Sequence, residues 1–235
     1  MIEFRALRSS SAGNGYVVGD GATRLLIECG VHYRELQRLL GFRVAELDGA
    51  LVSHEHGDHA CAAVAVMRAG VDVYASAGTW SALQPAALHR AHAVEAGKPF
   101  SVGTWRIMPF PTVHDAVEPL GFYLASPAGR VLYITDSAYC AHRFAGLTML
   151  AVEANYSEKI LQDRVNAGEL APAHRNRVLR NHLSLERLVK MLTANDLSRV
   201  EAIHLLHLSD GNSDAERFRE TVAAATGKPV YVAAK

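Results

Sequence analysis

Hydrophobic and polar positions along the chain predict short strands that alternate with helices. Apolar or alternating runs bounded by Gly, Pro, Asn or Asp are typical of strands, whereas apolar residues three or four positions apart are typical of helices. On these criteria we expect strands at residues 2–7, 16–18, 23–27, 50–53, 71–75, 105–110, 120–125, 130–135, 147–152, 200–206 and 229–233. We expect helices at 33–40, 58–67, 79–90, 157–168, 184–194 and 213–225. This alternation predicts sheets that are covered by helices.

Two segments between these elements differ in composition from the rest. Residues 9–15 read Ser-Ser-Ser-Ala-Gly-Asn-Gly, and such small residues predict a turn between two strands. Residues 168–181 have no clear periodicity, so we expect an ordered loop or lid there.

Length and composition indicate a globular protein. A chain of 235 residues, 49% of them hydrophobic, can bury a substantial core, and we expect a single domain over residues 1–235. Neither a signal-peptide pattern nor an apolar run long enough to span a bilayer occurs in the sequence, so no membrane partner is expected. Three cysteines without paired spacing favour a reducing compartment and a cytoplasmic location. We expect all three, Cys29, Cys61 and Cys140, to be small buried residues.

Net charge limits how the protein could bind nucleic acid. The 24 Lys and Arg residues balance the 24 Asp and Glu residues, so no global excess of positive charge attracts phosphate. The stretch from Glu158 to Lys190 is locally basic, with seven Lys or Arg residues against four acidic ones. This stretch suits a phosphodiester substrate, but a solvated helix face with salt bridges explains it equally well.

The strongest chemical signal is the run His-Glu-His-Gly-Asp-His at residues 54–59. It follows a strand that is expected to be buried, and it precedes an apolar helix. Neutral imidazoles and a carboxylate are the ligands that Zn, Mn and Fe accept, and this spacing can direct them at two ions from one loop. The alternative, a chance run of surface histidines, does not explain the apolar flanks.

This run resembles the signature of the metallo-β-lactamase superfamily of hydrolases. The resemblance extends along the chain, because the superfamily's later residues have counterparts at His114, Asp136 and His207, each expected at a strand end. It implies an α/β fold of the metallo-β-lactamase type, a four-layer αβ/βα sandwich in which two mixed β-sheets are flanked by helices.

The resemblance also implies two divalent metal ions, Zn²⁺ or Mn²⁺, with Fe as a further candidate. One ion would be bound by His54, His56 and His114, the second by Asp58, His59 and His207, and Asp136 would bridge them. Two ions that share a carboxylate can hold a hydroxide between them and stabilise an in-line displacement.

Softer similarities favour the YycJ/WalJ-like branch, whose members are regarded as nucleases or phosphodiesterases. They lie at residues 7–15, 25–30, 152–156, 181–184 and 207–213. This branch implies hydrolysis of nucleic acid and favours an exonuclease, with nucleic acid or another phosphodiester as the partner.

Four further residues are candidates for the site. Glu28 stands where the superfamily usually has Asp, and we expect it to orient a metal-bound histidine rather than bind metal itself. His182 is expected to contact a substrate phosphate or to protonate the leaving oxygen, which makes it, with Asp58, a catalytic candidate. Its alternative role is structural, at the start of the helix expected at 184–194. Asn14 and Ser11 could bind a substrate phosphate, although Gly-Asn-Gly is also an ordinary turn.

Two other functions are compatible with the sequence. One is a small-molecule hydrolase that acts on cyclic nucleotides, alkyl phosphodiesters, lactones or thioesters, which the neutral net charge favours. The other is a non-catalytic protein whose metals only support the fold, against which the complete ligand set argues. The sequence does not indicate an oligomeric state.

Overall fold

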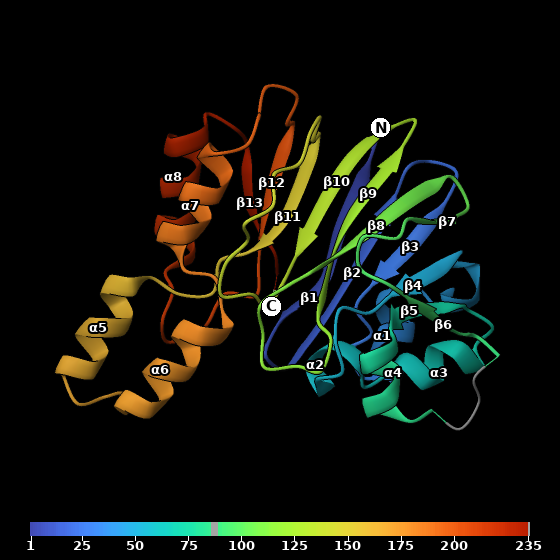
Figure 1. Ribbon diagram of the computed structural model, residues 1–235, viewed down its shortest axis with the longest axis horizontal. Helices are drawn as coiled ribbons and strands as arrows, with labels where there is room; N and C mark the ends of the chain where they lie inside the picture. Colours follow the sequence, from blue (N-terminus) through green and yellow to red (C-terminus); the bar gives the residue numbers. More distant parts are fainter. Residues whose placement is uncertain (86–88, 235) are drawn as a thin grey trace. The chain divides into compact units, whose positions relative to one another are not determined.

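The computed structural model describes residues 1–85 and 89–234, which form two β-sheets with helices (Figure 1). The chain divides into two compact units. The first contains Met1–Pro111 and Ala116–Arg130, and the second contains Thr112–Asp115 and Val131–Ala233. The prediction of a single domain stays a prediction. Within the described residues, no helix combines the length and apolarity needed to cross a bilayer.

Six strands of the first unit form a mixed sheet in the order of the chain. The strands are β1 (Glu3–Ser10), β2 (Gly13–Gly19), β3 (Arg24–Ile27), β4 (Gly49–Leu51), β5 (Val73–Ser76) and β6 (Ala91–Val94). Pairs β1–β2 and β2–β3 are antiparallel, and β3 to β6 are parallel. The alternation of the sequence predicts every strand of this sheet except β6, which is short and mostly half-exposed.

The turn predicted at residues 9–15 is shorter than expected. Only residues 11 and 12 turn, and Ser9, Ser10 and Gly13 pair across the hairpin of β1 and β2. The small polar residues are extended because their side chains have buried partners: the hydroxyls of Ser9 and Tyr16 lie 2.6 Å apart, and Tyr16 donates to Asn14 Oδ1 at 3.0 Å. Such partners satisfy buried polar groups that would otherwise favour a solvated turn.

Helices of the first unit contribute their apolar faces to its core. They are α1 (Tyr33–Leu39), η1 (Val44–Glu46), α2 (Gly57–Ala60), α3 (Ala63–Arg68) and α4 (Ala77–Leu83). The single helix predicted at 58–67 is interrupted at residues 61 and 62, where the Ala62 amide donates to Cys29 O at 2.8 Å instead of continuing α2. The helix predicted at 79–90 ends at Leu83, and residues 86–88 of that range lie outside the described residues.

The second sheet has seven strands in the order β13-β12-β11-β10-β9-β8-β7. In the first unit, β7 (Phe100–Val102), β8 (Trp105–Pro111) and β9 (Leu120–Ser126) are antiparallel, and β7 is a strand that the sequence pattern missed. The other strands are β10 (Gly129–Ile134), β11 (Met149–Glu153), β12 (Ala202–Leu206) and β13 (Val230–Val232), which are parallel. They belong to the second unit from Val131 onward. Both sheets are therefore mixed.

Parallel pairing in the second unit determines where polar residues gather. Strand β10 pairs Ile134 with Val152 of β11, and β11 pairs Glu153 with Leu206 of β12. The interiors of these strands are apolar and buried, as is typical of parallel sheets. Polar residues that closely follow these strands, including Asp136 and His207, consequently meet at one edge of the sheet.

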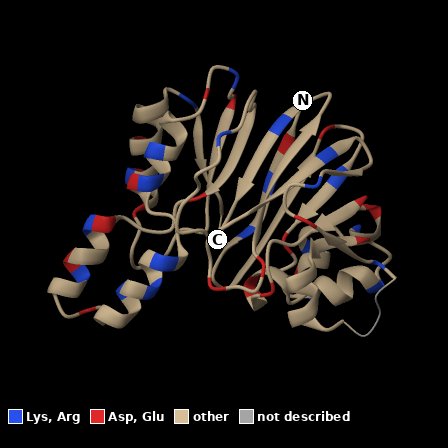
Figure 2. Cartoon of the chain, in the orientation of Figure 1, with Lys and Arg blue, Asp and Glu red and all other residues tan. Residues whose placement is uncertain are grey.

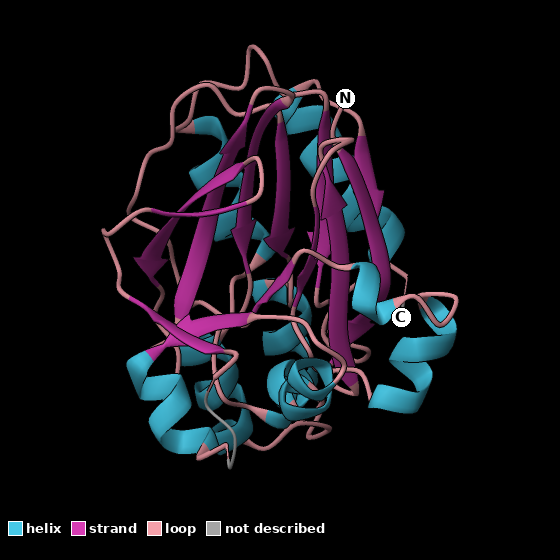
Figure 3. Ribbon diagram, turned by 90° about the vertical axis from the view of Figure 1, so that its right-hand side faces the viewer, coloured by secondary structure: helices cyan, strands magenta, loops and turns pink. Residues whose placement is uncertain are grey.

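Four helices belong to the second unit, and one of them was not predicted. They are α5 (Glu158–Asn166), α6 (Pro172–Asn181), α7 (Leu185–Thr193) and α8 (Ala215–Thr226). The loop or lid expected at 168–181 is wrong for most of its length, because Pro172 begins α6 in the first-turn position that proline favours. Few of its residues are apolar, so periodicity alone does not reveal it. The helices and strands are coloured separately in Figure 3, and Figure 1 shows α5 and α6 as a helical hairpin.

Candidate functional site

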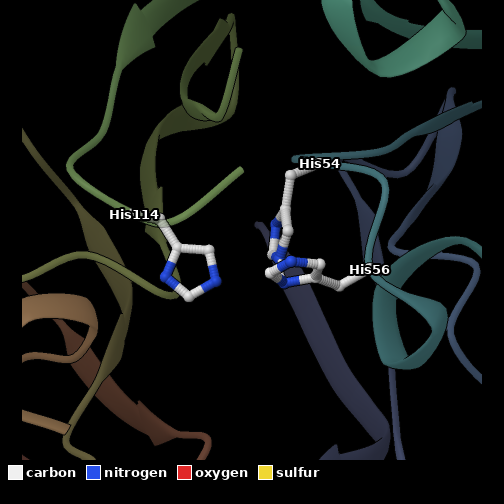
Figure 4. Close-up of side chains that lie close together, drawn as sticks. All are labelled: His54, His56 and His114. Atoms are coloured by element: carbon white, nitrogen blue, oxygen red, sulfur yellow. Dashed lines mark hydrogen bonds between the residues drawn. The ribbon is translucent and has the colours of Figure 1, made fainter. Parts of the chain in front are cut away.

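The loop after β4 brings three histidines of the first unit together. His54 and His59 are buried, and α2 begins at Gly57, immediately after His56. His54 Nε2 lies 3.1 Å from His56 Nδ1, and Figure 4 shows both rings extending from the same loop. The ring of His59 stacks at an angle against His54, with 4.2 Å between centroids. This spacing lets nitrogen lone pairs of neutral imidazoles converge on a cation.

Two side chains from neighbouring strands contact His59. Glu28, which follows β3, lies with Oε2 3.4 Å from His59 Nδ1 and accepts the Ser53 amide at 3.2 Å. Asn14 Nδ2 lies 3.2 Å from His59 Nε2 and donates to the carbonyl of Asp58 at 3.2 Å. A carboxylate on one ring nitrogen orients the imidazole, which is the role that the sequence predicts for Glu28. Asn14 is fully buried within the protein, whereas Ser11 is exposed at the hairpin turn, and phosphate binding by either stays a prediction.

Gly30, three residues after the end of β3, lies very close to the backbone of the histidine loop. A Cβ atom added to Gly30 would lie 1.6 Å from the carbonyl oxygen of Asp58. We therefore expect Gly30→Ala to displace residues 58–59 and to destabilise the protein by more than about 3 kcal/mol, as overpacking against backbone requires.

Gly57 provides a matched control on the same loop, because nothing lies within 4 Å of an added Cβ there. Urea unfolding should show a large loss of stability for Gly30→Ala and almost none for Gly57→Ala. Equal stabilities of the two variants would show that this close approach does not exist.

At the strand ends of the second unit, Asp136 and His207 are both buried. His207 Nδ1 lies 3.2 Å from Asp136 Oδ1, and Asn155 Nδ2 donates to His207 O at 2.9 Å. Both residues have a left-handed backbone, with φ of 42° for Asp136 and 53° for His207, and Glu28 of the first unit has φ of 67°. Left-handed non-glycine residues cost about 1–3 kcal/mol each and concentrate at functional sites.

Glu153 is a site residue to which the sequence assigned no role. This fully buried carboxylate accepts from His182 Nδ1 at 2.7 Å, and its Oε1 also lies 3.3 Å from His207 Nδ1. Its second oxygen accepts the amides of Ser137 at 3.1 Å and Leu183 at 3.0 Å. The only available signal was its place in the stretch 152–156, which carried a family similarity without a role.

One donor atom from each of four residues lies within 4.8 Å of the others: Asp136, Glu153, His182 and His207. Carboxylate oxygens and imidazole nitrogens suit divalent Zn, Mn and Fe. The second unit therefore contains a group of side chains that could hold a metal ion.

His114 (Figure 4) belongs to the short segment of the second unit that follows β8. Its Nε2 lies 3.4 Å from Asp136 Oδ2, and its Nδ1 lies 3.0 Å from Asn181 O. Burial lowers the pKa of His114, and the nearby charge of Asp136 only partly opposes this effect. A neutral imidazole whose far nitrogen is held by a carbonyl is the usual form of a metal-binding histidine.

His182 lies immediately after α6, and its pKa is shifted in the opposite direction from that of His114. Burial disfavours its imidazolium form, but the Glu153 carboxylate outweighs burial and raises the pKa of His182. Its side chain is 20% exposed, so a proton on this ring can reach a ligand. A partly exposed imidazole held by a carboxylate is an arrangement in which a histidine can donate a proton.

The three cysteines differ in solvent exposure, although the sequence predicts all three to be buried. Cys29 is buried and Cys140 is partly exposed, whereas Cys61 is exposed. The prediction that Cys61 is buried is wrong because it ends α2 at the surface, where its thiol donates to Gly30 O at 3.3 Å.

Comparisons with known proteins show which family and which solved structures the chain resembles. A model of the Beta-lactamase superfamily domain matches residues 23–205. Among curated relatives, Exodeoxyribonuclease WalJ of Streptococcus pneumoniae is 29% identical, over 94% of this chain and 87% of its own length. Exodeoxyribonuclease YycJ of Bacillus anthracis is 26% identical, over 94% and 88% of the two chains.

Similar solved structures include the metallo-β-lactamase fold protein YhfI from Bacillus subtilis, with a TM-score of 0.76 and 18% identity. The match covers 99% of this chain and 96% of YhfI. Zn²⁺-bound PqqB from Methylobacterium extorquens has a TM-score of 0.72 and 15% identity, and the match covers 100% of this chain and 99% of PqqB. The likeness confirms the predicted fold class.

Proposed function

Because this chain belongs to the beta-lactamase superfamily and is a metal-dependent hydrolase, we propose that it is an exonuclease that hydrolyses the phosphodiester bonds of DNA. The observation that carries the proposal is the collection of buried carboxylates and imidazoles at strand ends, in a chain similar over 94% of its length to curated exodeoxyribonucleases. DNA as the substrate is inferred from the names of these relatives.

We assign two divalent ions to the residues that the family resemblance selects. His54, His56 and His114 would hold one ion, Asp58, His59 and His207 the other, and Asp136 would bridge them. Contacts within each unit support this assignment: His54 and His56 present nitrogens 3.1 Å apart, and Asp136 lies beside both His114 and His207. When bound, such a pair of ions supplies an activated water and neutralises charge on the attacked phosphate. Zn²⁺ and Mn²⁺ suit these donors, and Fe suits them too.

His182 has the contacts needed to protonate the leaving oxygen. Glu153 holds Nδ1 of the ring at 2.7 Å, which leaves Nε2 to face a ligand. The raised pKa keeps a larger share of the ring protonated near neutral pH than an ordinary histidine would have. Glu153 acts here as a positioning residue, because its contacts are with His182, His207 and two backbone amides and not with substrate.

Helix α6 offers the local positive charge that a neutral chain needs in order to bind DNA. Arg177 and Arg180 are exposed and lie three residues apart on a helix that ends at Asn181, next to His182. In Figure 2 this helix carries blue Lys and Arg positions. The helix has no acidic residue of its own, although Arg177 Nε lies 3.8 Å from Asp115 Oδ2. This basic face favours a polymeric phosphodiester over the small-molecule substrates that remained open.

Replacing Arg177 or Arg180 by Ala should weaken DNA binding equally for all sequences. Each lost phosphate contact should reduce the slope of log Kd against log salt concentration by about one. Fluorescence anisotropy of a labelled single strand at several salt concentrations measures this slope. Arg217→Ala on α8 is the matched control and should leave it unchanged. Unchanged slopes for both α6 variants would contradict a role of α6 in DNA binding.

A comparison of linear and circular DNA tests the exonuclease directly. With Mn²⁺ or Zn²⁺, the protein should release mononucleotides from linear DNA and leave closed circles intact. Cleavage of circles would indicate an endonuclease. Turnover of bis-p-nitrophenyl phosphate or cyclic nucleotides far above that of any oligonucleotide would instead favour the small-molecule hydrolase.

A further inference from the structure

The second unit contains a pocket of about 330 Å³ that the proposed reaction does not use. Its walls are residues 139–143, which follow β10, and the side chains of α7, including Arg187, Lys190 and Met191. Pockets that bind small ligands begin at about 300 Å³, so this one is large enough for a single small molecule or one unit of a polymer.

The charge of this pocket is positive. Arg143, Arg187 and Lys190 line it, and none of the described residues in its lining is acidic. Arg143 and Lys190 are exposed, and neither forms an ion pair with any other part of the described chain. Arg187 is more constrained, because it donates to Ala138 O at 2.8 Å and lies 3.9 Å from Glu158 Oε1. Two free cations and one fixed guanidinium suit an anionic ligand.

Beside these cations the pocket has an apolar surface. Tyr139 is 54% exposed, which is unusual for a large ring, and Met191 and Leu183 also line the pocket. A flat ring and a thioether next to cations match the chemistry of a nucleotide, whose base stacks and whose phosphate takes the charge.

Hydrogen bonds connect the pocket walls to the candidate site through Glu153. The Ser137 and Leu183 amides both donate to Glu153 Oε2, and the Ser137 hydroxyl donates to Tyr139 O at 2.8 Å. The other oxygen of Glu153 accepts from His182. Leu183 of the pocket wall therefore contacts the same carboxylate that holds His182, although none of the candidate metal-binding side chains in the described chain lines the pocket.

We propose that this pocket binds one nucleotide of the substrate strand, adjacent to the nucleotide whose phosphodiester bond is hydrolysed. The ligand class is a nucleoside monophosphate unit, held by Lys190 and Arg143 at its phosphate and by Tyr139 at its base. The inference rests on the proposed function for its place in the reaction, but binding of a free nucleotide tests the pocket separately.

Titration of the full-length protein with dAMP, read from the methyl signals of labelled methionines, is the first experiment. Met191 lines the pocket, whereas Met67 and Met108 belong to the first unit and serve as internal controls. We expect a saturable shift of the Met191 signal only. Lys190→Glu should raise the Kd for dAMP about tenfold, a change of about 1.4 kcal/mol, and Arg217→Glu should not change it. No saturable Met191 shift, or an unchanged Kd in both Lys190→Glu and Arg143→Glu, would overturn the proposal.

Kinetics then connect the pocket to catalysis. Lys190→Glu should raise KM for an oligonucleotide about tenfold while kcat stays the same, since the residue touches a neighbouring nucleotide and not the reacting atoms. Hydrolysis of bis-p-nitrophenyl phosphate, which has no neighbouring nucleotide, should be unaffected. An unchanged KM for oligonucleotides would overturn the role in the strand. Binding of dAMP near Met191 without any DNA cleavage would refute the proposed exonuclease activity but would still support a nucleotide-binding pocket.

Discussion

Replacing Asp136 by Ala is expected to lower the rate of DNA hydrolysis by at least about three orders of magnitude, because the residue would bridge both ions that activate the attacking water. Asp136 is also the side chain that contacts His114 and His207 at 3.4 and 3.2 Å. The variant should bind fewer metal ions per chain, which elemental analysis of the purified protein measures alongside the rate.

Asp163→Ala is a suitable control for Asp136→Ala, because Asp163 is exposed on α5 and pairs only with Lys159 in the described part of the chain. Its rate and metal content should match those of the unchanged protein. A fully metal-loaded Asp136→Ala variant that retains activity would refute the bridging role.

Glu153→Ala should reduce both stability and activity. Removal of this carboxylate leaves the Ser137 and Leu183 amides and the His182 ring without their acceptor in a buried environment. Loss of one partner of a buried charged network costs about 3–5 kcal/mol, and loss of a residue that orients metal-site histidines costs about 10- to 100-fold in activity. Urea unfolding and kcat measure the two effects.

The pH profile distinguishes positioning from simple loss of structure. Glu153 raises the pKa of His182, so its replacement by Gln should move the basic limb of the kcat profile to lower pH. Glu201→Ala, at an exposed position of the same unit, should change neither stability nor profile by a measurable amount. An unshifted profile in a folded Glu153→Gln variant would contradict the assignment of His182 as the acid.

Local sequence was sufficient to predict the histidine loop and most strands, because the residues that identify each of them are neighbours in the chain. Residues 54–59 carry several potential ligands within one run, and the apolar strands β10 and β12 end directly before polar residues. A chemist can read such a pattern without knowing how distant segments pack.

Glu153 could not be predicted in this way. Its partners His182 and His207 are 29 and 54 residues away. The parallel pairing of β11 with β12 brings Glu153 beside His207, and the end of α6 supplies His182. The left-handed backbone of Asp136 and His207 is similarly a product of tertiary structure. Helix α6 escaped prediction for the opposite reason, since its exposed arginines leave almost no apolar stripe to detect.

Release of mononucleotides from linear DNA by the unchanged protein and by Asp58→Ala, each with its metal content determined, tests the central claim most directly. A metal-dependent exonuclease should release nucleotides in the presence of Mn²⁺ or Zn²⁺, lose this activity in EDTA and regain it when metal returns. Asp58→Ala should release almost none. Absence of release by the unchanged protein, or equal release by Asp58→Ala, would contradict the account.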